Sequence, residues 1–396
     1  MKCTFDFAFH NLGYNAKSLN NDKYRTLKNI LQPLKLHFYL TISFFIFCLT
    51  GNGQTDSSRW AEKPEVSYSG YLDIYYGYDF NEPKTNYRQP FLYSFNRHNE
   101  FNLNLGLIKV SAKHLKYRAN IAMQAGTYVM DNYTNEETAL KYINEGNAGL
   151  SLNKKNNLWL DVGILGSLIG FESAISKDSW TLTRSLLAEN SPYFLSGAKL
   201  TYNPNEHWEL AALVCNGWQR IKKVSGNSLP AFCSQVKYTK SDKLTFNWST
   251  FIGTDDPDTT RRMRYFNNFY VQSQLTKKLG FIAGFDIGAQ QIKKSSEDYD
   301  VWFSPVVIVR YMWNDKWTSA LRAEHYQDKD GVIVNTGTSN GFKTSGISLN
   351  FDYSPFKNIV WRLEGRWLSS RDKIFQKQNN LINENFAIVS SIAVQF

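Results

Sequence analysis

From Glu65 to its last residue, the chain repeats one pattern in which apolar and polar residues alternate with a period of two. In the first run, Leu72 and Ile74 alternate with Asp73 and Tyr75. Successive side chains of a β-strand point to opposite faces, so this run predicts a strand with one apolar and one polar face. Helical periodicity is almost absent from the same region. The pattern therefore predicts an all-β protein.

The alternation recurs in about sixteen segments, with fourteen to eighteen as the range. They begin near residues 65, 99, 115, 142, 158, 193, 207, 230, 243, 264, 279, 300, 316, 341, 359 and 385. Each is roughly as long as a tilted strand that crosses a bilayer. One segment is expected to place Phe101, Leu103, Leu105 and Leu107 together on the apolar face.

The connections between these segments are alternately short and long. The short ones, such as Asn153–Asn157 and Asn203–Glu206, are rich in the Asn, Lys and Asp that tight turns favour. The long ones span roughly residues 81–97, 128–141, 166–192, 218–229, 254–263, 292–299, 327–340 and 370–384. Short periplasmic turns and long extracellular loops are typical of an up-and-down antiparallel transmembrane β-barrel.

Charge placement distinguishes this barrel from a soluble one. The apolar face carries essentially no charge at mid-strand, where a charge facing lipid would cost about 2–4 kcal/mol. The opposite face carries the candidate lumen charges, which are Asp73, Glu100, Arg118, Glu145, Asp161, Lys199, Glu209, Asp286, Arg310, Arg322, Glu324, Arg362, Glu364 and Arg366. We therefore expect residues 65–396 to enclose a polar lumen. Its charges nearly balance, so we expect weak ion selectivity.

The remaining composition excludes several function classes. The net charge of +10 is spread without a run of Lys and Arg, so no nucleic-acid partner is expected. Cys215 and Cys233 are expected to face each other on neighbouring strands of a hairpin centred near Val224, as a disulfide or as two small buried residues. The six His are not closely paired and no C-x-x-C occurs, so we expect no metal site and no cofactor.

The N-terminal region has a pattern that is typical of an export signal. His37–Leu49 is the only long apolar run, too short to span a bilayer as a helix. Lys28 and Lys35 precede it, and Gly51 and Gly53 offer small residues for cleavage after Gly53. We expect residues 1–53 to be a signal peptide with an over-extended N-terminus, and residues 54–64 to be a short periplasmic lead.

The third long connection, residues 166–192, is unusually apolar for a loop. It contains Leu168, Ile169, Phe171, Ile175, Trp180, Leu182, Leu186 and Leu187. Two interpretations stay open: the loop packs on the rim or on neighbouring loops, with a short helix near Asp178, or it folds into the lumen and narrows it. In the second case, Glu172, Arg184 and Glu189 would be constriction charges.

Enzymatic signals are weak. Gly337–Gly341 matches G-x-S-x-G, but it precedes a strand and lacks the strand-to-helix turn of that motif. His98 near the rim has no Ser partner that the sequence identifies. Asp255, Asp256 and Asp258 lie on one outer loop, where they would bind a divalent cation near lipopolysaccharide phosphates or stay solvated. Arg261, Arg262 and Arg264 follow, and they would bind those phosphates directly or neutralise the loop.

Four segments resemble the β-barrel porin family described as OmpL-like, which is widespread in Bacteroidetes. They are Arg97–Asn104 (RHNEFNLN), Trp180–Tyr193 (WTLTRSLLAENSPY), Asn216–Arg220 (NGWQR) and Gly284–Gly288 (GFDIG). The resemblance covers roughly residues 65–396 and implies an outer-membrane barrel with porin activity. It carries over no catalytic residue or substrate.

These observations predict a channel for passive diffusion of small hydrophilic solutes or ions. The alternative is a closed structural or adhesion barrel, or an outer-membrane enzyme. Expected partners are outer-membrane lipid and lipopolysaccharide, the solutes themselves, and a second and third copy of the chain in a homotrimer. The terminal Phe396, on the apolar face with Ile388, Ile392 and Val394, resembles the signal that barrel-assembly machinery recognises.

Overall fold

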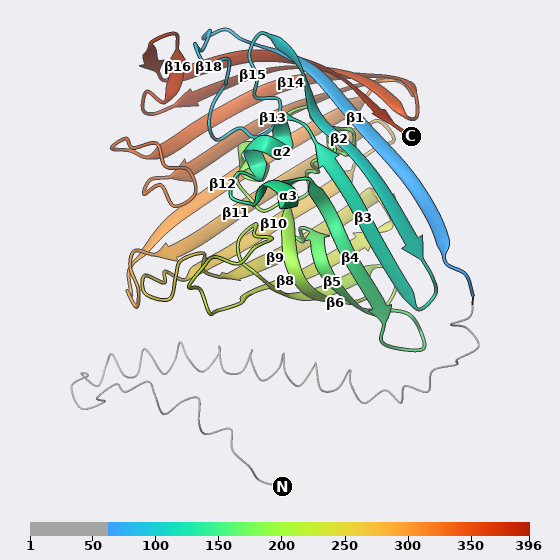
Figure 1. The fold of residues 1–396 in the computed structure, drawn as a ribbon. Helices are drawn as coiled ribbons and strands as arrows, with labels where there is room; N and C mark the ends of the chain where they lie inside the picture. The colour runs from blue at the N-terminus through green and yellow to red at the C-terminus, as the bar shows by residue number, and fades with distance from the viewer. Residues whose placement is uncertain (1–61) are drawn as a thin grey trace, which may run out of the picture. The chain divides into compact units, whose positions relative to one another are not determined.

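Residues 62–396 are described by the computed structural model, and within them sixteen antiparallel strands form one closed barrel (Figure 1). Each strand pairs with its neighbours along the chain, and β1 closes the barrel against β18. The barrel strands are β1 (Glu65–Asp79), β2 (Glu100–Lys113), β3 (Tyr117–Ala125), β4 (Ile143–Ser151), β5 (Leu158–Gly166), β6 (Phe194–Tyr202), β7 (Trp208–Cys215), β8 (Ala231–Lys240), β9 (Leu244–Gly253), β10 (Arg264–Gln274), β11 (Leu279–Gln291), β12 (Tyr299–Met312), β13 (Trp317–Asp328), β14 (Phe342–Phe356), β15 (Ile359–Ser370) and β18 (Glu384–Gln395). The predicted sixteen-stranded up-and-down barrel is confirmed, and every strand begins within two residues of its expected position.

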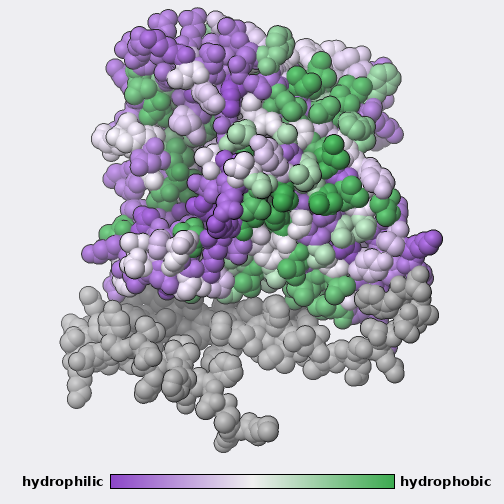
Figure 2. Space-filling model, viewed as in Figure 1, coloured by the Kyte–Doolittle hydropathy of each residue, from purple (hydrophilic) through white to green (hydrophobic). Residues whose placement is uncertain are grey.

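The two faces of the strands divide by polarity as the alternation predicts. On β15, Trp367 faces outward, whereas the side chains of Arg362, Glu364 and Arg366 face inward and are buried. Figure 2 shows apolar residues gathered on the outer surface over β1–β4, and hydrophilic residues gathered at the end that carries the long loops. This distribution fits a barrel whose outside meets lipid.

The prediction for β2 is wrong over half its length. The pairing of β1 with β2 shifts between Asp73 and Ile74, which leaves Asn104 as an extra residue in β2. Such a bulge moves all later side chains of a strand to the opposite face. Leu105 and Leu107 therefore point inward and are buried.

The long loops carry the remaining regular structure. These elements are α2 (Thr127–Asn132), α3 (Thr138–Lys141), the one-turn 3-10 helix η2 (Ser176–Asp178), α4 (Leu186–Glu189), and the hairpin of β16 (Phe375–Lys377) and β17 (Asn380–Ile382). A 3-10 turn, η3 (Ser241–Lys243), connects β8 to β9. Among residues 62–396, no helix has both the length and the apolar character to cross a bilayer.

The C-terminus pairs with the middle of β1. Phe396 N–H donates to Gly70 O at 2.9 Å, and Gly70 N–H donates to Phe396 O at 2.6 Å. The predicted signal peptide, residues 1–53, lies outside the described residues, as does most of the predicted lead, residues 54–64.

Candidate functional site: the barrel interior

The loop of residues 166–192 connects β5 to β6 and packs on the inner wall of the barrel. Its first part is held by amide and hydroxyl side chains that point inward. Leu168 O accepts hydrogen bonds from Gln235 Nε2 at 3.0 Å and from Ser249 Oγ at 2.6 Å. Gly170 N–H donates to Asn268 Oδ1 at 3.1 Å. These three side chains come from β8, β9 and β10.

The second part of the loop is held by buried charges. Thr183 N–H donates to Glu364 Oε2 at 2.6 Å, and Arg322 donates to Thr183 O at 2.6 Å and to Glu364 Oε1 at 2.8 Å. Leu186 N–H donates to Glu324 Oε2 at 2.7 Å, and Arg322 Nε lies 3.3 Å from Glu324. The charges thus serve as partners for loop backbone groups that would otherwise be buried without hydrogen bonds.

Apolar contacts complete the attachment. Trp180 and Leu187 of the loop form a buried cluster with Ile282 and Ile308, which point inward from β11 and β12. The guanidinium of Arg310 lies 4.2 Å from the Trp180 ring centroid. The apolar residues of the loop, which signalled burial in the sequence, therefore face the barrel interior.

Four cavities follow one another along the opposite wall, from the loop end of the barrel to the turn end. The outer cavity, about 720 Å³, is lined by long loops and includes Tyr87 and Trp218. The central cavity, about 360 Å³, is bounded by Leu105 and Tyr270. The third and fourth cavities, about 340 and 430 Å³, both touch Arg118.

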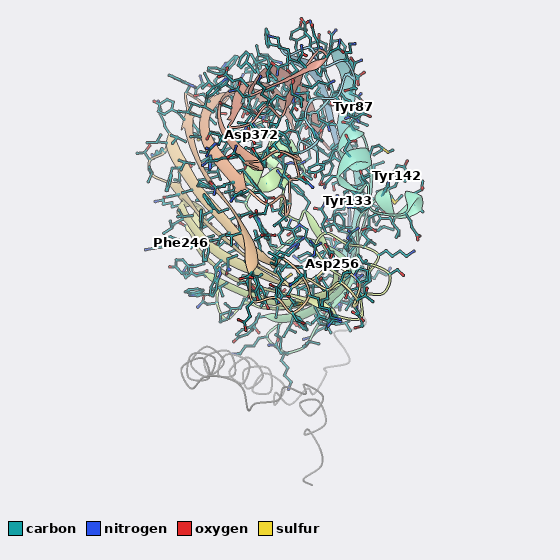
Figure 3. All side chains as sticks on the ribbon, turned by 90° about the vertical axis from the view of Figure 1, so that its left-hand side faces the viewer. Tyr87, Tyr133, Tyr142, Phe246, Asp256 and Asp372 are labelled. Atoms are coloured by element: carbon teal, nitrogen blue, oxygen red, sulfur yellow. The ribbon has the colours of Figure 1, made fainter. Side chains whose placement is uncertain are left out.

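Neighbouring cavities in this series share lining residues. Glu145 borders the central and third cavities, and Arg118 borders the third and fourth. Tyr133 borders the outer and central cavities. Figure 3 looks toward the loop end, where Tyr87, Asp256 and Asp372 mark surrounding loops and Tyr133 lies nearer the middle.

The structure divides the predicted lumen charges into two groups. Arg118, Glu145 and Asp161 line the third cavity together with Lys199 and Glu209, and Arg118 pairs with Asp161 at 2.5 Å. A second group is covered by the loop, and its members contact the loop directly or through a neighbouring side chain: Asp73, Asp286, Arg310, Arg322, Glu324, Arg362, Glu364 and Arg366. Glu100 lies at the loop end of β2 and accepts a hydrogen bond from Asn102 at 2.8 Å. The expectation that the whole inner face is wet is therefore wrong, because the loop fills one side.

The three predicted constriction charges differ in accessibility. Glu172 is half-buried and borders the central cavity. Glu189 borders the outer cavity but is as buried as Arg184, whose Nε lies 3.8 Å from Glu189 Oε1. Arg184 is enclosed by the rings of Tyr128 and Tyr193, at 4.6 and 4.1 Å from their centroids, and is only 2% exposed. Burial raises the pKa of Glu172, although the charge of Arg322 acts in the opposite direction.

Cys215 and Cys233 lie on the same face of β7 and β8 as free, buried thiols with their Sγ atoms 3.9 Å apart. They are diagonal neighbours, since Cys215 lies opposite Ala231 and Cys233 opposite Leu213. The expectation that Cys215 lies directly opposite Cys233 is therefore wrong by two residues along β8.

Acidic and basic residues of the loop between β9 and β10 form ion pairs with one another. Asp256 contacts Arg262 at 2.7 Å and Asp258 contacts Arg261 at 2.5 Å. Within residues 62–396, no group of three or more His, Cys, Asp or Glu has the arrangement of a metal site.

Solved porins share this architecture. The anion-selective porin from Comamonas acidovorans matches with a TM-score of 0.57 at 9% identity, covering 84% of this chain and 100% of that one. The outer-membrane channel DcaP of Acinetobacter baumannii matches with 0.55 at 11% identity, covering 87% and 100%. OmpF of Salmonella typhi, solved with daunomycin, matches with 0.58 at 10% identity, covering 84% and 98%. At these identities the likeness shows the fold.

No curated protein sequence matches the chain. A family model described as "Putative beta-barrel porin-2, OmpL-like" matches residues 65–396. The chain therefore belongs to this porin family, and it is a porin of the bacterial outer membrane.

Proposed function

We propose that small hydrophilic solutes diffuse through this porin along the wall formed by β2–β7, because the loop of residues 166–192 narrows the lumen from the other side. The observation that carries the proposal is the asymmetry of the interior. Loop backbone groups are hydrogen-bonded to side chains of β8–β15, whereas the cavities that share lining residues lie beside β2–β7. Polar residues such as Asn120 and Asn147 line that side and can replace part of a solute's hydration.

The charges with exposed surface on this route are Glu172 of the loop, and Arg118 and Glu145 of the wall. We assign solute contact to these residues. Arg184 and Glu189 instead hold the loop together, because both are buried and the Arg184 guanidinium packs against the rings of Tyr128 and Tyr193.

We further propose that the porin has no enzymatic activity. His98 supports this view, because its Nδ1 accepts a hydrogen bond from Asp79 N–H at 2.9 Å and the side chain is buried. Gly337–Gly341 lies in the loop before β14 rather than in a strand-to-helix turn. OmpT of Vibrio cholerae, solved in a trimer form, shares the fold with a TM-score of 0.54, and we propose a homotrimer here by analogy.

Loop deletion tests the narrowing. Removing residues 170–188 should raise single-channel conductance in a planar bilayer, because the attached half of the lumen would open. The matched control removes residues 293–298 from the loop between β11 and β12, which should leave conductance unchanged. Equal conductance in wild type and in the 170–188 deletion would show that the loop does not narrow the pore. Liposomes that fail to swell with any sugar, for wild type and deletion alike, would favour the closed structural or adhesion barrel.

A further inference from the structure

Two aromatic rings separate the outer cavity from the central cavity. Among the described residues, Tyr133 and Phe194 are the two that line both cavities. Their rings stack with centroids 4.4 Å apart and planes 14° apart. Tyr133 follows α2 in the loop between β3 and β4, whereas Phe194 begins β6. The ring pair therefore joins the middle of the second long loop to the strand that follows the third.

The residues that precede Phe194 in the chain show where the outer cavity ends and the central cavity begins. Glu189, Asn190 and Ser191 line the outer cavity, whereas Pro192 and Tyr193 line the central one. The lining thus changes from one cavity to the other within a few residues of Phe194.

The ring pair is held firmly on the Tyr133 side. Tyr133 N–H donates to Val129 O at 3.2 Å, which fixes the residue to the last turn of α2. Its ring meets Tyr128 edge-to-face at 6.2 Å, and Tyr128 in turn contacts Tyr193 and the guanidinium of Arg184. Tyr133 and Phe194 are 1% and 2% exposed, so the stacked faces exclude water.

We propose that the Tyr133–Phe194 ring pair is the size-determining element of this porin. The inference rests on the proposed route along β2–β7, because that route crosses the boundary between the outer and central cavities. A solute passes only when the two rings separate, and a larger solute requires a wider separation. Since the rings present apolar faces, the barrier acts on size and hydration and not on the sign of charge. Its role is therefore distinct from that of Glu172.

Liposome swelling with sugars of graded size tests the proposal. Tyr133→Ala removes one ring from a loop, and Phe194→Leu removes the other ring while keeping an apolar side chain in β6. Each variant should admit a larger sugar than wild type and swell several-fold faster with the sugar nearest the wild-type limit. Tyr133→Phe keeps the stack and should retain the wild-type limit.

Tyr87→Ala is the matched control, because Tyr87 lines the outer cavity without bordering the central one. It should leave the size limit unchanged. Folding of each variant is checked by the heat-dependent shift of intact barrels in gel electrophoresis. A folded Tyr133→Ala or Phe194→Leu barrel with the wild-type size limit would overturn the role of the ring pair.

The same assay separates this inference from the proposed function. If wild type and both variants fail to swell even with a monosaccharide, the proposed diffusion route fails. If wild type swells with small sugars but the ring variants do not change the limit, the route stands and the ring pair is excluded. If wild type is closed and the variants swell, the rings are the barrier.

Discussion

Arg322→Met should release the third loop from the barrel wall. The Arg322 side chain is fully buried on β13 and donates to Thr181 Oγ1 at 2.9 Å, to Thr183 O at 2.6 Å and to Glu364 at 2.8 Å. Its Nε also lies 3.3 Å from Glu324. Methionine keeps the apolar stem of the side chain and removes every one of these polar contacts.

The magnitude follows from what the substitution leaves behind. Removing one partner of a buried ion pair costs roughly 3–5 kcal/mol, because the other charge stays buried. Glu364 keeps its hydrogen bonds from Thr183, and Glu324 keeps Arg366 at 2.8 Å, so the lower end applies. At about 1.4 kcal/mol per factor of ten, the detached population of the loop should rise roughly a hundredfold.

Limited proteolysis measures that population. Trypsin should cut the loop after Lys177 in the refolded barrel, and the cleavage rate follows the open population when opening is fast relative to cutting. Arg118→Met is the matched control, since Arg118 pairs with Asp161 on the opposite wall and lines the cavities there. A wild-type cleavage rate in Arg322→Met, or an equal increase in both variants, would refute the attachment that we describe.

Three further predictions concern the wall, the outer loops and the strand end. Glu145→Gln should make the channel less cation-selective, because Glu145 borders two cavities and its substitution leaves Lys109 without its charged partner. Lys109→Met should shift the reversal potential in a KCl gradient in the opposite direction, and shifts of equal sign would contradict this role. Burial acts to raise the pKa of Asp256, but hydrogen bonds and charge from Arg262 outweigh it and hold the pKa below its usual value. The Asp256–Arg262 contact should therefore persist below the ordinary Asp pKa and weaken only in stronger acid, as measured by hydrogen exchange of residues 254–263. A rise in exchange already near the ordinary Asp pKa would be incompatible with this contact. Phe396→Lys should reduce the fraction of folded barrel in the outer membrane, and normal insertion would rule out an assembly role for the terminal ring.

Most of the barrel could be predicted because a lipid-facing strand has a strict period of two. Trp367 and Arg366 illustrate this, since a charge on the lipid side is costly and no alternative face exists for either residue. Turn composition then fixed the strand starts. Leu105 and Leu107 were misplaced because the bulge at Asn104 depends on the pairing with β1, and local sequence does not encode that pairing.

The interior was harder to predict because its burial is set by residues distant in the chain. Arg322 and Glu364 have the sequence environment of lumen charges exposed to water, yet both are covered by Thr183 from a loop well over a hundred residues earlier. The apolar content of residues 166–192 did signal burial. Tyr133 and Phe194 carried no signal as a pair, because an aromatic residue at a strand end is ordinary in such barrels and only the three-dimensional contact joins them.

The one-sided attachment of the loop also divides the barrel mechanically. Strands β8–β15 carry a cross-linked interior of buried ion pairs and apolar contacts, as the core of a soluble protein does. Strands β2–β7 also bury apolar residues such as Leu105 and Ile164, but they border cavities of about 340 and 360 Å³. Local stability follows the density of such contacts, so we expect slower hydrogen exchange in β8–β15 than in the strands that border the cavities.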